Sequence, residues 1–173
     1  KIMPLRVSLP DGTAYLSAIA TAITWAADNG ARVANVSFQS AAGSPTVQNA
    51  ASYMKSKGGL VVVSAGNSYG FEAFAASDSL IAVAATDGSD AKASFSSYGA
   101  YVDVAAPGVG IYSTVRGGSY GAVSGTSFAA PITGGVIALM MARNPSLTPA
   151  QLESILKSTA VDLGTSGRDD YFG

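Results

Sequence analysis

The chain contains two short runs of uninterrupted apolar residues, at positions 60–63 and 80–85. Runs of this length without alternation are typical of central strands that are buried on both faces of a parallel sheet. Two helix-like patterns precede these runs, an amphipathic stripe in residues 13–28 and a second helix that opens at Ser44, and a further strand is predicted between them at residues 32–38. This alternation of helix and strand predicts an α/β fold, with a mostly parallel, doubly wound sheet flanked by helices.

Start and stop signals bound the predicted helices. Thr13 is expected to cap the first helix, and Asn29-Gly30 supplies its left-handed stop. Ser44-Pro45 opens the second helix. A long helix of small and apolar residues is predicted over 126–143, and residues 148–151 form a capping box for the last helix. No internal repeat or low-complexity linker interrupts this order, which indicates one domain.

Composition narrows the classes of protein to which the chain can belong. Apolar residues make up 48% of the sequence and charged residues 12%, which indicates a globular chain. The formal net charge is −1 and no basic run is present, so nucleic acid and anionic membrane surfaces are not expected as partners. No apolar stretch approaches the ~20 residues that span a bilayer.

The sequence contains neither cysteine nor histidine. The lack of cysteine excludes thiol catalysis, disulfides and thiolate metal sites. The lack of histidine excludes His-ligated zinc and any Ser–His pair contained within this chain. Metal sites of these two kinds are therefore not expected, no residue is singled out as a metal ligand, and a catalytic histidine would have to come from outside these residues.

Ser119 lies in Gly-Gly-Ser-Tyr-Gly at 117–121, a formal match to the nucleophile elbow of α/β-hydrolases. That motif needs a buried strand before the serine and a helix straight after it. Here the preceding segment is short and the following one is strand-like, so the tip of a β-hairpin explains the glycines better. We interpret Ser119 as a loop serine, and an esterase that uses it is the less favoured alternative.

Ser127 lies at the mouth of the long predicted helix. Unpaired backbone N–H groups at a helix N-terminus can stabilise an alkoxide and donate to an oxyanion. Small residues let this helix pack closely, and Pro131 is tolerated because we expect it near the first turn. A serine or threonine that simply caps a buried helix fits the same residues equally well. The residues alone leave catalysis and capping open.

Residues 125–131, Gly-Thr-Ser-Phe-Ala-Ala-Pro, resemble the active-site serine signature of the subtilisin family, G-T-S-x-A-x-P. Three further resemblances follow in the family's order: the strand that pairs with substrate at 35–37, the turn of the oxyanion-hole asparagine at 63–67, and the F-S-S-x-G and D-V-x-A-P-G stretch at 95–108. The resemblance runs from about Pro4 to Leu163. It implies a subtilisin-like doubly wound fold.

The resemblance assigns Ser127 as the nucleophile that attacks a peptide carbonyl. Asn67 would donate its side-chain amide to the oxyanion, together with the backbone N–H of Ser127. An amide suits that position because it donates a hydrogen bond without titrating. Taken by itself, Asn67 after Gly66 would be an ordinary turn residue.

Peptide substrates in this family add as an extra strand, through main-chain hydrogen bonds. The resemblance implies two segments around the first specificity pocket: Ser37, Phe38 and Gln39 on one side, and Ser64, Ala65 and Gly66 on the other. Gln39 and Ser40 stand where family members commonly have glycine. A glutamine at the pocket wall would narrow the pocket or offer an amide to the substrate side chain.

In subtilisin-like enzymes the triad runs Asp, His, Ser along the chain, so both partners of Ser127 would lie upstream of Lys1. Without a base the serine hydroxyl is a weak nucleophile, and this chain alone is expected to be inactive or nearly so. Residues 1–173 would be a partial catalytic domain, roughly its C-terminal two thirds. A sheet without its first strands exposes an apolar edge, so we expect assembly with the missing N-terminal part or self-association.

The family further implies a secreted serine endopeptidase that acts on polypeptides. It requires no cofactor, although structural calcium is compatible with the family. Asp103 stands where some members place a weaker cation site, but a solvated aspartate at a strand end explains it better. The alternative from another class is a non-catalytic pseudo-peptidase that keeps the groove to bind peptides. An upstream sequence with an aspartate strand and a histidine at a helix start would distinguish the two.

Overall fold

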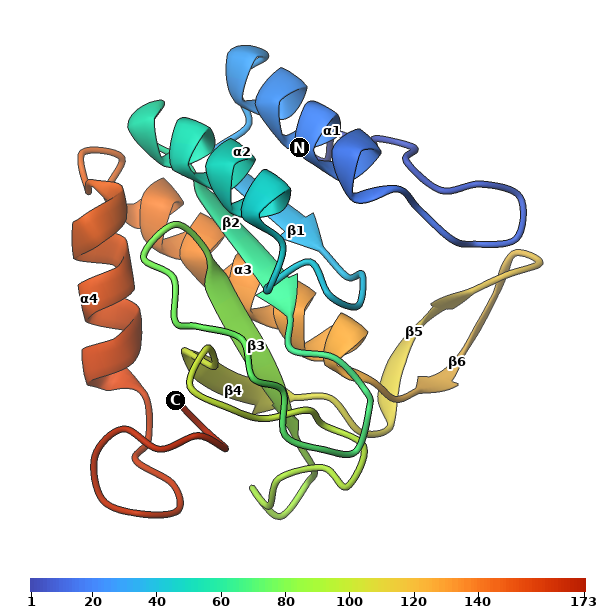
Figure 1. Cartoon of the computed structure of the whole chain (residues 1–173), viewed down its shortest axis with the longest axis vertical. Helices are drawn as coiled ribbons and strands as arrows, with labels where there is room; N and C mark the ends of the chain where they lie inside the picture. Colours follow the sequence, from blue (N-terminus) through green and yellow to red (C-terminus); the bar gives the residue numbers. More distant parts are fainter.

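The computed structural model describes residues 1–173 and contains a four-stranded parallel sheet (Figure 1). Its strands lie side by side in chain order: β1 Val33–Val36, β2 Leu60–Ser64, β3 Ile81–Thr86 and β4 Val104–Pro107. Every residue of β2 and β3 is buried, as the two apolar runs predict. The α/β architecture expected from the sequence is confirmed.

Helices cover both faces of the sheet, as Figure 1 shows. On one face lie α1 Leu16–Asp28 and α2 Pro45–Ser56, and on the other lie α3 Thr126–Arg143 and α4 Pro149–Thr159. Alternate residues of β2 divide between the two layers, since Val61 and Val63 pack toward α1 and α2 while Leu60 and Val62 pack toward α3 and α4. The strands β5 Ile111–Val115 and β6 Ser119–Val123 form a separate antiparallel hairpin that projects from the body.

The first helix begins later than predicted. Thr13 is not its cap, because both its backbone N–H and its hydroxyl donate to Asp11 Oδ1 in a local turn. The helix starts at Leu16, and no side chain caps it. Its predicted end is confirmed: Gly30 has φ +83° and the Ala31 N–H donates to the Ala26 carbonyl at 2.9 Å.

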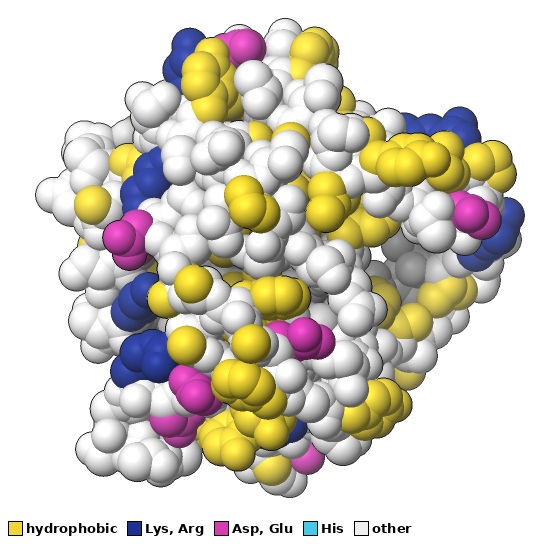
Figure 2. Space-filling model, viewed as in Figure 1, with side chains coloured by type: hydrophobic (Ala, Val, Ile, Leu, Met, Phe, Trp, Pro, Cys, Tyr) yellow, Lys and Arg dark blue, Asp and Glu magenta, His cyan; other side chains and the backbone are white.

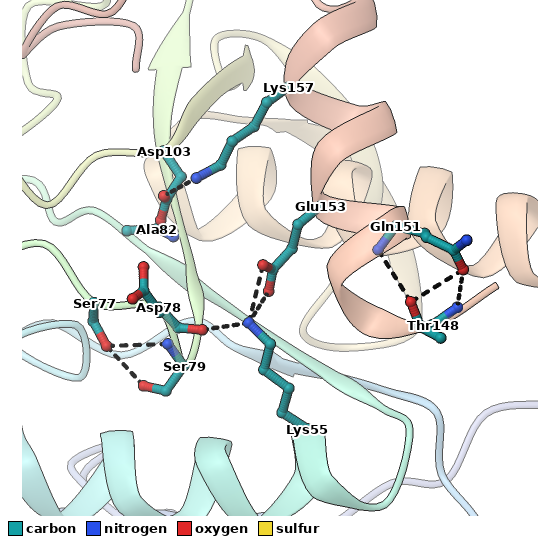
Figure 3. Close-up of polar contacts among 10 residues, drawn as sticks. All are labelled: Lys55, Ser77, Asp78, Ser79, Ala82, Asp103, Thr148, Gln151, Glu153 and Lys157. Carbon is teal, nitrogen blue, oxygen red and sulfur yellow. Dashed lines mark hydrogen bonds and ion pairs between the residues drawn. The ribbon is translucent and has the colours of Figure 1, made fainter.

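The remaining helix signals behave as expected, with one exception. Ser44 accepts the N–H of Val47 at the start of α2, and Thr148 and Gln151 form both bonds of the capping box of α4 (Figure 3). Lys55 on α2 pairs with Glu153 on α4 at 2.8 Å and ties the two helices together. The exception is Pro131, which lies inside α3 as its sixth residue, beyond the first turn where we expected it.

The surface carries charges of both signs and a number of apolar side chains. Figure 2 shows lysine, arginine, aspartate and glutamate interspersed on one face, which is hollowed at the right, beside the projecting segments. By length and composition alone α3 could cross a membrane. It contacts all four strands of the main sheet, however, which is the position of a core helix.

Candidate functional site

The carboxyl ends of β1 and β2 and the start of α3 meet on one side of the sheet. Val36, the last residue of β1, stands beside Val63 of β2, so the loops that follow these strands are neighbours. The chain leaves β2 through Ala65, Gly66 and Asn67. Ser127 is the second residue of α3, directly after the buried Thr126. The structure thus brings together the two residues that the sequence assigns to the chemistry.

The side-chain amide of Asn67 is held by its oxygen. Asn67 Oδ1 accepts the backbone N–H of Thr126 at 2.9 Å and the Thr126 hydroxyl at 3.0 Å. The Thr126 hydroxyl oxygen in turn accepts the N–H of Gly66 at 3.1 Å. Because the oxygen of the amide is engaged, its nitrogen is left to donate elsewhere.

The nitrogen atoms of two hydrogen-bond donors lie close to one point beside Gly125. A methyl group placed on Gly125 would lie 3.6 Å from Asn67 Nδ2 and 3.7 Å from the backbone nitrogen of Ser127. Gly125 has φ +152° and no side chain, so the space before these two nitrogens stays open. Such a pair of N–H donors at a helix mouth can stabilise negative charge on an oxygen bound between them.

Ser37 contacts the nucleophile turn from the side of β1. Its hydroxyl donates to the carbonyl oxygen of Ser127 at 2.9 Å and accepts the side-chain amide of Asn35 at 3.0 Å. This carbonyl would otherwise bond the N–H of residue 131 four positions later, but Pro131 has none. Ser37 supplies the missing donor.

The two segments predicted to flank the specificity pocket differ in their main-chain bonds. The N–H groups of residues 37–39 donate to no acceptor within the chain. Those of Ala65 and Gly66 are already paired, with the Val83 carbonyl and the Thr126 hydroxyl. Ser64 is the last residue of β2 and is buried. The backbone N–H groups of residues 37–39 are therefore available to a further strand, whereas those of Ala65 and Gly66 are already used within the chain.

Gln39 lies close to the segment that contains Gly66. A methyl group placed on Gly66 would lie 4.0 Å from Gln39 Cγ and 2.9 Å from Ser97 Oγ. The stem of Gln39, from the opposite segment, therefore runs close to the bare α-carbon of Gly66. Ser40 next to it has φ +65°, a left-handed conformation in which glycine would be free of strain.

A polar cluster supports the turn after Asn67, and sequence reasoning missed it. Ser97 Oγ accepts the N–H of Ser68 at 3.1 Å, and the Ser68 hydroxyl donates to Glu72 at 2.6 Å. The Tyr101 hydroxyl donates to the Ala65 carbonyl at 2.7 Å, and burial, reinforced by the Glu72 charge, raises the pKa of Tyr101. The phenol thus remains a donor at neutral pH. No local pattern indicates the contacts of Ser97 and Tyr101, because their partners lie 29 and 36 positions away in the sequence.

Ser119 is the first residue of β6 and pairs with Val115 across the hairpin. It is exposed, and a strand rather than a helix follows it. The interpretation of the glycines at 117 and 118 as the tip of a hairpin is confirmed, whereas the interpretation of Ser119 as a loop residue was wrong, because it belongs to β6. The arrangement that an elbow serine requires is not present around Ser119.

The interpretation of Asp103 as a solvated aspartate was wrong. Its side chain is 15% exposed, and its two oxygens accept the Ala82 N–H at 2.9 Å and Lys157 Nζ at 2.6 Å (Figure 3). Burial raises the pKa of Asp103, while Lys157 and the Ala82 N–H offset part of that rise. No local pattern indicates this ion pair, because Lys157 lies on α4, 54 positions further along the chain. No three or more acidic side chains of the chain lie together in an arrangement that could hold a metal ion.

Comparison with known proteins agrees with this geometry. The profile of the Subtilase family, Peptidase S8, matches residues 1–173. The chain belongs to the subtilase family. It is 44% identical over 166 residues to alkaline elastase YaB of Bacillus sp. (strain YaB), covering 94% of this chain and 43% of that protein. It is 39% identical to subtilisin BL of Lederbergia lenta over 168 residues, covering 96% of this chain and 62% of that protein.

Solved subtilase structures share the fold. Sphericase superposes with a TM-score of 0.82 at 33% identity, and the match covers 96% of this chain and 64% of that one. A cold-adapted subtilisin-like serine proteinase matches with a TM-score of 0.77 at 33% identity, over 90% of this chain and 58% of that one. The subtilase chain described here therefore spans about half to two thirds of the relatives it matches. The family resemblance and the subtilisin-like fold are confirmed.

Proposed function

We propose that this subtilase chain provides the nucleophile and the oxyanion-binding groups of a serine endopeptidase. The observation that carries the proposal is the pair of nitrogens, Asn67 Nδ2 and Ser127 N, near one open point in front of Gly125. Attack of Ser127 Oγ on a peptide carbonyl would place negative charge on the carbonyl oxygen. Two donors held close to that position would stabilise the charge with little reorganisation.

The proposal requires a general base that the chain does not contain, since it has no histidine. We place the histidine and the aspartate in an upstream part of the same domain, in the family order Asp, His, Ser. Residues 1–173 would then be roughly the C-terminal two thirds of one catalytic domain. By itself the chain would be inactive or nearly so, because an unassisted serine hydroxyl is a weak nucleophile.

The free edge of the sheet supports this assembly. β1 is paired only with β2, and an apolar groove of about 1200 Å³ runs past it, lined among others by Ile23, Val33 and Met141. On α3 the side chains of Val136 and Leu139 are 42% and 72% exposed. Upstream strands and helices of the same domain would cover this apolar surface. Without them the chain would self-associate.

Substrates would be polypeptides bound in an extended form. The unpaired N–H groups of residues 37–39 would bond the substrate backbone, and Ser64, Ala65 and Gly66 would form the facing wall of the first pocket. We place the protein outside the cell, by analogy with the family and because a chain without cysteine is indifferent to the oxidising conditions there. Any structural calcium would be held by residues beyond this chain.

The test is peptide hydrolysis by the longer polypeptide that contains this chain. Ser127→Ala should abolish turnover, while the matched change Ser119→Ala should leave kcat and KM unchanged. Loss of an oxyanion-hole donor in a subtilisin lowers kcat by about 10²–10³, and Asn67→Ala should do the same here. Peptide binding without hydrolysis by the unmodified protein would favour the pseudo-peptidase alternative and sink the proposal.

A further inference from the structure

We propose that Glu72 makes the first specificity pocket selective for lysine and arginine side chains. The inference rests on the proposed function and names its substrate class, polypeptides that are cleaved after a basic residue. Glu72 lies on the loop between β2 and β3, and this loop starts in the segment 64–66 that would form the facing wall of the pocket. The catalytic scheme gives Glu72 no task.

Three consecutive contacts connect the wall to the carboxylate of Glu72. A methyl group placed on Gly66 would lie 2.9 Å from Ser97 Oγ. Ser97 Oγ lies 2.7 Å from Ser68 Oγ, and the Ser68 hydroxyl donates to Glu72 Oε1 at 2.6 Å. These distances put the carboxylate oxygen no more than about 8 Å from that methyl position, within the ~10 Å over which charges interact at 0.1 M salt.

The carboxylate is held in place relative to the wall. A carboxylate oxygen accepts, so the Ser68 hydroxyl hydrogen is used on Glu72, and the Ser97 hydroxyl donates to Ser68 Oγ. Ser97 is fully buried, and its oxygen also accepts the Ser68 N–H at 3.1 Å. Glu72 itself is half-buried. A chain of hydrogen bonds that starts at a buried hydroxyl therefore ends on the charge.

The negative charge of Glu72 has no cationic partner within the chain. None of the four ion pairs includes Glu72. Its charge acts on the wall, because burial first, and then the charge of Glu72, raise the pKa of Tyr101, whose hydroxyl donates to the Ala65 carbonyl at 2.7 Å. A lysine or arginine side chain of the substrate would supply the missing cation.

The position of Gln39 agrees with such an occupant. Gln39 Cγ would lie 4.0 Å from the same methyl position on Gly66. A pocket narrowed by this stem would admit an unbranched chain more easily than a ring. Lysine and arginine have narrow aliphatic stems that end in a charge, so the width set by Gln39 and the charge of Glu72 would select the same side chains.

The test compares two peptides that differ only in the residue before the scissile bond, lysine in one and norleucine in the other. Norleucine keeps the lysine stem without its amine, so the ratio of the two kcat/KM values isolates the charge. In the full-length protein the lysine peptide should be favoured by about fivefold or more. Glu72→Gln keeps an acceptor for Ser68 and should bring the ratio close to one, and Glu72→Lys should favour the norleucine peptide.

The control is Asp78→Asn, which removes the same charge from the same loop. The Asp78 carbonyl accepts from Lys55 just ahead of β3, at the edge of the sheet opposite the site (Figure 3). The ratio should not change in this variant. A ratio that stays the same in Glu72→Gln, or that falls equally in Asp78→Asn, would overturn the inference. Thermal unfolding of each variant identifies any loss that is due to misfolding.

Binding to a protein without the nucleophile separates this inference from the proposed function. In Ser127→Ala, calorimetry gives the Kd of both peptides without turnover. A preference for the lysine peptide that disappears when Glu72→Gln is added would uphold the role of Glu72, even if the unmodified protein hydrolysed no peptide and the proposed function failed. Equal Kd values in a protein whose unmodified form hydrolyses peptides would overturn the inference alone. Binding of neither peptide would overturn the inference as well.

Discussion

The hydroxyl of Ser37 donates a 2.9 Å hydrogen bond to the carbonyl oxygen of Ser127. It occupies the place of the intrahelical donor that Pro131 lacks. The end of β1 is thereby joined to the first turn of α3 across 90 residues of sequence. A proline in the second turn of α3 is tolerated because another element satisfies the carbonyl that the proline leaves free.

This relationship predicts a specific double-mutant cycle. Ser37→Ala should lower the free energy of unfolding by about 1 kcal/mol, because the Ser127 carbonyl loses its donor. In a Pro131→Ala background the same change should cost much less, since residue 131 can then donate within the helix. Urea unfolding of the four proteins measures the coupling. Strictly additive costs would show that Ser37 does not substitute for the absent N–H.

The backbone conformation of Ser40 indicates that a glycine at this position would stabilise the protein. Its φ of +65° costs an L-residue about 1–2 kcal/mol, and a glycine avoids this strain. The greater flexibility of glycine in the unfolded chain costs about 0.4–1 kcal/mol, so Ser40→Gly should raise the free energy of unfolding by roughly 0.5–1 kcal/mol.

Ser94→Gly is the matched control, because Ser94 is exposed in a turn and its φ is not positive. Only the flexibility cost applies there, so the control should be neutral or destabilising. Equal effects at the two positions would contradict the assignment of strain to Ser40.

Asp103 predicts a pH dependence of stability. Burial raises its pKa in the folded protein above the ordinary 3.8, so the folded state holds a proton more tightly than the unfolded one. The ionised carboxylate is therefore destabilising, and its cost grows as the pH rises from about 3.8 through the folded pKa. The free energy of unfolding is measured as a function of pH for the wild type and for Asp103→Asn. The difference between the two should isolate this decline.

Lys157 should determine the pH range over which stability declines as Asp103 ionises. Removing its charge with Lys157→Met takes away the cation that lowers the pKa of Asp103, so the loss of stability should extend to higher pH. Lys57→Met, on the surface at α2, is the control for removal of a positive charge. A decline that stays in place in Lys157→Met would contradict the pairing.

The position of Gln39 leads to a prediction about the size of the substrate side chain that the proposed first specificity pocket accepts. Its stem lies beside the α-carbon of Gly66, so small substrate side chains should be preferred next to the scissile bond. Gln39→Gly should raise kcat/KM for a phenylalanine substrate relative to an alanine substrate by about 10-fold, which corresponds to one or more methylenes accommodated. An unchanged ratio would place Gln39 outside the pocket.

Much of the fold could be predicted from local sequence. The uninterrupted apolar runs predict β2 and β3, and the predicted stop at Gly30 is realised with positive φ. These elements could be predicted because the residues that determine each of them lie within a few positions of one another. The prediction that Thr13 caps α1 was wrong because of another local contact. Asp11, two residues earlier, accepts both the backbone N–H and the hydroxyl of Thr13.

Only part of the candidate site could be predicted from the sequence. The family signature leads to Ser127 and Asn67, but the bonds that orient them join distant segments, from Ser37 to Ser127 and from Thr126 to Asn67. One clue was available, since a proline four residues after Ser127 implies a carbonyl that needs another donor. Long-range contacts such as that between Lys157 and Asp103 leave no trace in a single sequence.

The most direct measurement is the site at which a fluorophosphonate probe reacts. The full-length protein is treated with the probe, digested and sequenced by mass spectrometry, with Ser127→Ala and Ser119→Ala treated in parallel. We expect one adduct, on Ser127, that persists in Ser119→Ala and disappears in Ser127→Ala. An adduct on Ser119, or none on a folded protein that hydrolyses peptides, would contradict the assignment of Ser127 as the nucleophile.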